Sequence, residues 1–91
     1  MMYKQVRFGD IPVGTVWSTD QPEESRRVDF WIKKEQRWKG TDLGRGGSQQ
    51  CDQTGRLRYP NDTSTYYSPN DSMAWIRIVD LASVDFDDLV Y

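Results

Sequence analysis

The sequence predicts a mainly β fold in one domain spanning residues 1–91, either a small barrel or a curled antiparallel sheet of about five strands. Short segments alternate apolar and polar residues with the period of two that marks half-buried strands. Turn-forming residues cluster between them, and no long helical period is present. Because a small sheet exposes its edges, closure into a barrel would protect them.

Alternation is clearest in RRVDFWIKK, residues 26–34. The segments predicted as strands are 3–8, 15–19, 26–34, 56–60 and 73–79, with 35–40 returning as a partner of the third and carrying Trp38. Between the first two, Ile11-Pro12-Val13-Gly14 predicts a type I turn, since Pro12 fixes φ and Gly14 closes the turn. One strand face is predicted to form the core: Val6, Phe8, Val28, Phe30, Ile32, Leu57, Ala74, Ile76 and Ile78.

Residues 40–72 are predicted to form one long polar loop, because five of the seven glycines fall there. GRGG at 44–47 lacks the Lys-Ser/Thr of a phosphate-binding loop, which favours a flexible segment. PNDTS at 60–64 and PNDSM at 69–73 are two turn signals within the loop. The acidic C-terminal tail, which contains DFDD at 85–88, could form a short helix or an irregular edge strand.

The composition argues against enzymatic chemistry. The chain has no histidine, which removes imidazole acid–base catalysis and the commonest metal ligand. The single cysteine, Cys51, cannot form a structural zinc site, and it is interpreted as an incidental thiol in a polar loop. DFDD does not follow calcium-loop spacing and is interpreted as solvated acid. We therefore expect no catalytic residues, no metal and no cofactor.

The chain is expected to be soluble and intracellular. The N-terminal MMYKQVRFGD has no apolar signal core, and no segment approaches the ~18 apolar residues of a membrane span. With one cysteine, no internal disulfide can form. The net charge of −2 combines a basic first half with an acidic second half, which does not favour nucleic acid as a partner.

FGDIPVGTVW at 8–17, followed by FWIKK at 30–34, resembles the opening of a loose group of small phage and prophage proteins. The matching residues are Phe8, Ile11, Val13, Gly14 and Lys33, with Trp17 in place of the usual phenylalanine. The resemblance covers residues 6–34. It implies an SH3-like β domain of viral or mobile-element origin that binds a host protein in the bacterial cytoplasm, and it supplies no functional residues.

The strand positions opposite the predicted core form an aromatic–basic face: Tyr3, Arg7, Arg27, Trp31, Lys33, Arg56, Arg58, Trp75 and Arg77. Exposed tryptophan beside arginine is typical of binding surfaces. The candidate partner-binding residues are Arg27, Trp31, Lys33, Arg58, Tyr66, Tyr67, Trp75 and Arg77. A structural alternative stays open, in which the 40–72 loop covers Trp31 and Trp75 as a minor core.

Two partner classes are compatible with this face. A host protein is the favoured partner, blocked or modulated in the manner of an anti-defence protein. The alternative is single-stranded nucleic acid, whose bases stack on aromatic rings beside basic side chains. The summed negative charge of the second half counts against phosphate.

Overall fold

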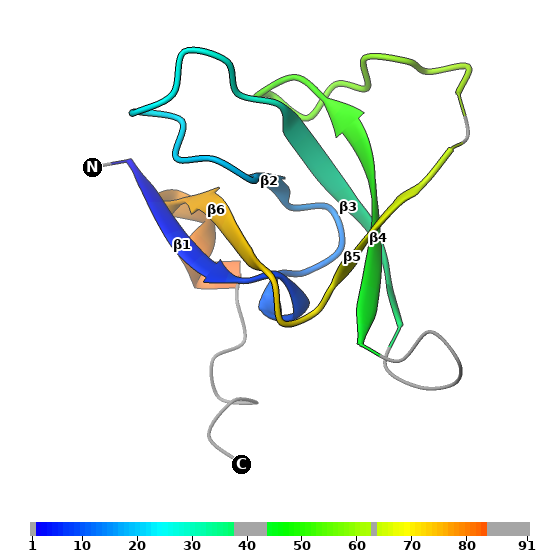
Figure 1. Ribbon diagram of the computed structural model, residues 1–91, viewed down its shortest axis with the longest axis horizontal. Coiled ribbons are helices and arrows are strands. Elements are labelled where there is room, and N and C mark those ends of the chain that lie inside the picture. The colour runs from blue at the N-terminus through cyan, green and yellow to red at the C-terminus, as the bar shows by residue number, and fades with distance from the viewer. Residues whose placement is uncertain (1, 38–43, 63, 84–91) are drawn as a thin grey trace.

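The computed structural model describes residues 2–37, 44–62 and 64–83 and shows a mainly β protein (Figure 1). Its elements are β1 (Tyr3–Arg7), η1 (Phe8–Asp10), β2 (Val16–Ser18), β3 (Phe30–Arg37), β4 (Arg45–Cys51), β5 (Tyr66–Pro69), β6 (Met73–Arg77) and η2 (Ile78–Ser83). The strands form one antiparallel sheet in the order β1-β6-β2-β3-β4-β5. η1 and η2 are 3-10 helices.

The sheet is open, so the predicted antiparallel β fold is confirmed and the closed-barrel alternative is wrong. β1 and β5 lie at opposite edges of the sheet, yet the segments that follow them meet. The Phe8 N–H donates to the Ser72 carbonyl at 2.7 Å, and the Gly9 N–H donates to the Asn70 carbonyl at 2.9 Å. The first bond continues the β1–β6 register, and the second holds η1 against the turn after β5. No strand ladder joins β1 and β5 in the described residues.

The turn before β2 lies one residue later than predicted and is of another type. The Thr15 N–H donates to the Pro12 carbonyl at 3.2 Å, so the turn spans residues 12–15. Gly14 occupies its third position with a φ of 97°, the positive value that a type II turn requires there. The Gly14 N–H also donates to the Lys33 carbonyl at 2.7 Å, which ties the turn to β3.

We expect Gly14→Val to lower the free energy of unfolding by about 1–3 kcal/mol, because a β-branched residue resists a positive φ. The site is otherwise open, with no heavy atom within 4 Å of the position that a Cβ would take, so the loss would come from backbone strain alone. Gly14→Asn is the matched control, since asparagine tolerates left-handed backbone. Thermal melts of both variants check this, and an unchanged melting temperature for Gly14→Val would contradict it.

β3 presents the opposite face to the core from the one predicted. The core consists of Val6, Phe8, Ile11, Trp17, Ala74 and Ile76, with Trp31 and Leu81 packed against it. Trp17 pairs directly with Trp31, so both rings lie on the inner face of the sheet. Phe30 and Ile32 are half-buried on the outer face, and Ile78 is 42% exposed. Alternation identifies two faces but does not say which one points inward.

The long loop predicted for residues 40–72 is also wrong, because two strands lie within it. β4 contains the last two of the three GRGG glycines. A Cβ on Gly46 would lie 2.6 Å from the Phe8 ring, and one on Gly47 would lie 2.5 Å from the Thr65 side chain. Gly46 therefore lets the core ring approach the β4 backbone, and Gly47 does the same for the Thr65 side chain. In contrast, 56–60 forms only the isolated bridge between Cys51 and Leu57, and 35–37 continues β3.

Both PND segments form turns as predicted. The Asp62 N–H donates to the Tyr59 carbonyl at 2.9 Å, and the Ser72 N–H donates to the Pro69 carbonyl at 3.1 Å. Trp38 and the tail at 84–91, including DFDD, lie outside the described residues. No helix in the described part of the chain is long and apolar enough to cross a bilayer.

Candidate functional site

Four aromatic rings run in a row from the core to the surface. Phe8 and Trp17 are 4.8 Å apart between ring centroids, and Trp17 stacks on Trp31 at 6.3 Å. Trp31 in turn contacts Tyr66 of β5 at 4.8 Å. Trp17 is 3% exposed, whereas Tyr66 is 48% exposed. The outer end of the row is therefore accessible and rests on a rigid, buried base.

A groove of about 360 Å³ opens over this outer end. We call it the Trp31–Tyr66 groove. Its lining residues are Trp31, Gln49, Gln50, Leu57, Tyr59, Asp62, Ser64, Thr65 and Tyr66. The sheet supplies the floor, and the connection from β4 to β5 supplies the remaining wall. Its size lies within the range of roughly 300–1,000 Å³ typical of ligand clefts, and its mixture of aromatic and polar side chains is typical of binding sites.

The groove is neutral except for one carboxylate. Among the described residues that line it, Asp62 alone carries a formal charge. The side-chain hydroxyl and then the backbone N–H of Ser64 hydrogen-bond to this carboxylate and lower its pKa, so Asp62 stays ionised. The Gln50 amide donates to Asp29 at 3.3 Å, which adds a second acid near one side. A phosphate group would meet repulsion here, whereas an apolar or cationic group would not.

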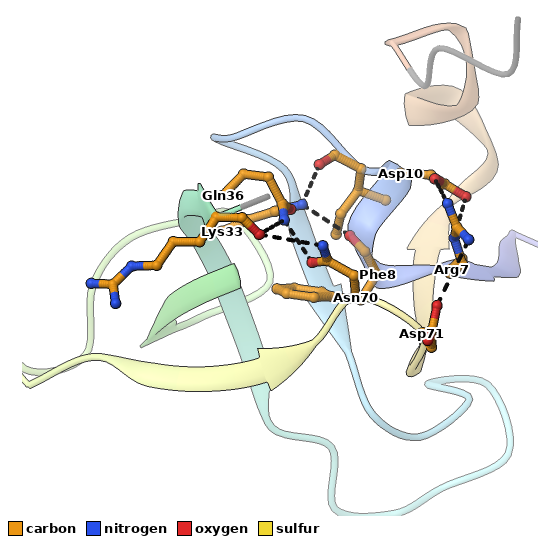
Figure 2. A network of polar contacts seen from close by, with 9 residues as sticks. Arg7, Phe8, Asp10, Lys33, Gln36, Asn70 and Asp71 are labelled. Atoms are coloured by element: carbon orange, nitrogen blue, oxygen red, sulfur yellow. Dashed lines mark hydrogen bonds and ion pairs between the residues drawn. The ribbon is translucent and has the colours of Figure 1, made fainter. Parts of the chain in front are cut away.

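Lys33, which the sequence placed on the aromatic–basic face, is 0% exposed and cannot contact a partner in this structure. Its Nζ donates to the carbonyls of Phe8 at 2.9 Å and Ile11 at 2.7 Å, and it lies 4.6 Å from the centroid of the Phe8 ring (Figure 2). Burial lowers the pKa of this amine from 10.5 to about 8, against an opposing contribution from Asp10. Lys33 therefore fastens η1 to β3.

Further polar contacts surround this lysine (Figure 2). The Arg7 guanidinium binds Asp10 at 2.9 Å and approaches Asp71 at 3.7 Å. The Gln36 amide donates to the Asn70 side chain at 2.6 Å, and the Asn70 N–H donates to the Gly44 carbonyl. The contacts join η1, β3 and the turn after β5. Because both partners of each contact are protein groups, we interpret the network as structural.

The remaining predicted site residues do not gather on one face. Trp31 and Tyr66 meet in the groove, and Arg58 neighbours Asp62 in a shallower depression on the loop between β4 and β5. Tyr67 lies on the opposite face of β5, where the Arg37 guanidinium covers its ring and donates to its hydroxyl at 3.0 Å.

The other members of the predicted face lie elsewhere. Trp75 is half-buried on the outer face of β6 opposite Gln5 and Ser18, and Arg77 pairs with Asp80 at 3.2 Å. Arg27 is exposed in the loop before β3. The alternative in which residues 40–72 cover Trp31 and Trp75 therefore holds in part for Trp31, because the connection from β4 to β5 lies beside it. Trp75 is not part of the same site.

Sequence reasoning missed Gln49, Gln50, Leu57 and Tyr59 as groove residues. The two glutamines lie in β4, which shows no apolar alternation, so no pattern signalled them. The alternation pattern assigns Leu57 to the core and Tyr59 to a strand. Tyr59 stands directly before the PNDTS turn, and an aromatic residue at a turn is the only local signal that could have singled it out.

The metal-ligating and nucleophilic side chains of the described residues were also candidates for a site. No group of three or more histidine, cysteine or acidic side chains there is placed to hold a metal ion. Cys51 is the last residue of β4 and not part of a polar loop, and it is fully buried. Burial and the neighbouring Asp52 raise the pKa of its thiol to about 11, which makes it a poor nucleophile at neutral pH.

Comparisons with protein-family models, with curated proteins and with solved structures found no match.

Proposed function

We propose that this chain is a non-enzymatic binding domain that accepts a segment of a protein partner in the Trp31–Tyr66 groove. The observation that carries the proposal is the row of rings ending in a half-exposed tyrosine at a groove of ligand size. Aromatic residues supported from beneath lose little conformational freedom on binding and commonly provide most of an interface's energy. The side-chain amide of Gln50, which lies on the same face as Trp31, can hydrogen-bond to a peptide backbone.

The proposed setting is that of a phage- or prophage-type protein in the cytoplasm of a bacterial host. There it would bind a host protein, including one of a defence system, and block or modulate it. This rests on the resemblance of residues 6–34 to small phage proteins and on the lack of a recognisable catalytic set in the described residues. Single-stranded nucleic acid is the competing partner, since bases also stack on exposed rings. Asp62 in the groove favours protein.

The first experiment identifies the partner class. The tagged full chain is used to capture partners from bacterial lysate, with and without nuclease, and captured proteins are identified by mass spectrometry. Affinity for the purified partner is then measured against salt. A protein bound through the groove should be retained after nuclease and respond weakly to salt. Loss of capture after nuclease, with a steep salt dependence, would instead assign nucleic acid.

We expect Tyr66→Ala to weaken binding of that partner by about tenfold or more, with little change in melting temperature, because the side chain is half-exposed. Trp31→Ala should weaken binding further and also destabilise the fold, since Trp31 packs on Trp17. Tyr67→Ala is the matched control: it removes the adjacent tyrosine, which lies on the opposite face of β5. Calorimetric affinities and thermal melts make this comparison. Equal losses for Tyr66→Ala and Tyr67→Ala, or none for either, would overturn the groove as the binding site.

A further inference from the structure

β1 lies at one edge of the sheet and pairs only with β6 among the described strands (Figure 1). The Ile78 N–H donates to the Met2 carbonyl at 2.8 Å, and the Phe8 N–H donates to the Ser72 carbonyl at 2.7 Å. Antiparallel pairs alternate, so Lys4 and Val6 also direct their backbone groups toward β6. The N–H and C=O groups of Tyr3, Gln5 and Arg7 consequently point away from the sheet, and no backbone bond is made by them elsewhere in the described chain.

Apart from the charged side chains of Lys4 and Arg7, this edge lacks the features that usually prevent pairing with another chain. Residues 3–7 contain no proline and no glycine, and the five β1–β6 pairs follow one another without a bulge. Lys4 and Gln5 at the centre of the strand are exposed. The strand at the other edge, β5, ends in Pro69, a residue that interrupts ladders. β1 is therefore the edge of the sheet that is prepared for an added strand.

We infer that the occupant of this edge is β1 of a second copy, paired antiparallel about a two-fold axis at Gln5. Tyr3 would then face Arg7 of the second copy, and Gln5 would face its own counterpart. The ladder then contains three pairs: Tyr3 with Arg7, Gln5 with Gln5, and Arg7 with Tyr3. The two residues of each pair can exchange two N–H···O bonds. The result is a continuous sheet through both copies, an interface in which each copy uses the same surface.

Side-chain charge favours the axis at Gln5 over an axis one residue away, at Lys4 or at Val6. An axis at Lys4 would place two ammonium groups directly opposite each other, which destabilises a strand pair. An axis at Val6 leaves Tyr3 without a partner and shortens the ladder. The axis at Gln5 places Lys4 opposite Val6 and puts the Arg7 guanidinium beside a tyrosine ring, a favourable arrangement. Arg7 is already held by Asp10 at 2.9 Å, so little of its freedom remains to be lost.

The inferred pairing is independent of the proposed function. The Trp31–Tyr66 groove is built on β3, β4 and β5, whereas the pairing uses β1 at the far edge of the sheet order. The dimer and the groove can therefore fail separately: the chain could dimerise without binding a protein partner, or bind a protein partner as a monomer. A five-residue strand pair is small for an interface, so we expect a reversible dimer whose population rises with concentration.

The test compares Gln5→Pro with Gln5→Ala in the full chain. Proline removes the outward N–H of Gln5 and leaves the bonds to β6 in place, whereas alanine removes the side chain and keeps the N–H. Molar mass is measured by sedimentation equilibrium up to about 1 mM, a range that detects dimers with millimolar or tighter Kd. We expect wild type and Gln5→Ala to dimerise and Gln5→Pro to stay monomeric with an unchanged circular dichroism spectrum.

Amide hydrogen exchange on the wild type provides a second measurement that does not depend on the proline variant folding. The Tyr3, Gln5 and Arg7 amides should become protected as concentration rises, while the Lys4 and Val6 amides, already bonded to β6, should change little. The inference would be overturned if the wild type or the Gln5→Ala variant remained monomeric, or if the Gln5→Pro variant still dimerised. It would also be overturned if amide protection did not change with protein concentration.

Discussion

Trp17→Ala should lower the free energy of unfolding by about 3–5 kcal/mol, the range for removing a large buried aromatic side chain. Trp17 is buried between Phe8 and Trp31, so its loss empties the centre of the aromatic row. A domain of this size has a total stability of about 5–12 kcal/mol, so the variant should lose a large part of it and melt well below the wild type. Chemical denaturation followed by tryptophan fluorescence and circular dichroism measures the loss.

Matched variants separate packing from hydrogen bonding at this position. The Trp17 indole Nε1 donates to the Ser48 Oγ at 2.9 Å in the interior. Trp17→Phe and Ser48→Ala should each destabilise by about 1–3 kcal/mol, because each leaves one buried polar group unpaired. The double variant removes both groups and should be destabilised by less than the sum of the two. A Trp17→Ala loss below that of Trp17→Phe would contradict the assignment of Trp17 to the core.

Stability should rise with pH above 8 because of Lys33. Its pKa is about 8 in the folded chain and 10.5 when unperturbed, so between these values the unfolded chain holds a proton that the folded chain has released. The free energy of unfolding then increases by about 1.4 kcal/mol per pH unit, or about 3 kcal/mol over the whole window. Below pH 8 both states are protonated and this dependence disappears.

Cys51 opposes the rise. Its pKa is about 11 in the folded chain against 9.0 unperturbed, so the unfolded chain loses its proton first and stability falls between these values. The wild type should gain stability from pH 8 to 9 and then level off. Cys51→Ala should continue to gain up to about pH 10.5, and adding Lys33→Met should remove the gain. Urea denaturation at each pH measures these profiles, and a flat profile for Cys51→Ala would show that Lys33 titrates normally.

Local turn and strand chemistry in the sequence predicted those parts of the fold that depend on neighbouring residues. Pro12 and Gly14 located the first turn to within one residue, and alternation located β1 and β6. β4 could not be predicted, because the close neighbours that favour glycine at Gly46 and Gly47 are Phe8 and Thr65, which belong to other segments. Lys33 was placed on the wrong face for a similar reason. The carbonyls that accept its ammonium protons belong to residues 22 and 25 positions away.

The sequence predicted the aromatic residues of the Trp31–Tyr66 groove but not the shape of the groove. Trp31 and Tyr66 were both candidates from composition, but their contact depends on the register of β3 on β4 and of β4 on β5. The sequence contains no signal for that register, because β4 carries little apolar alternation. The sequence grouped Trp75 with Trp31 because both alternate with apolar residues. In the sheet, Trp31 pairs with the inward-facing Trp17, whereas Trp75 pairs with Ser18 on the other face.

The pairing of β1 with β6 has a consequence for how the chain folds. β2, β3 and β4 follow one another in the sheet, so their contacts form within short stretches, whereas Tyr3 must find Arg77 across most of the chain. Closing so long a loop carries an entropic cost that shorter contacts have to offset first. During synthesis, β1 therefore leaves the ribosome before the strands that follow it and yet is completed last, because the edge that faces β6 stays unpaired until β6 has been made.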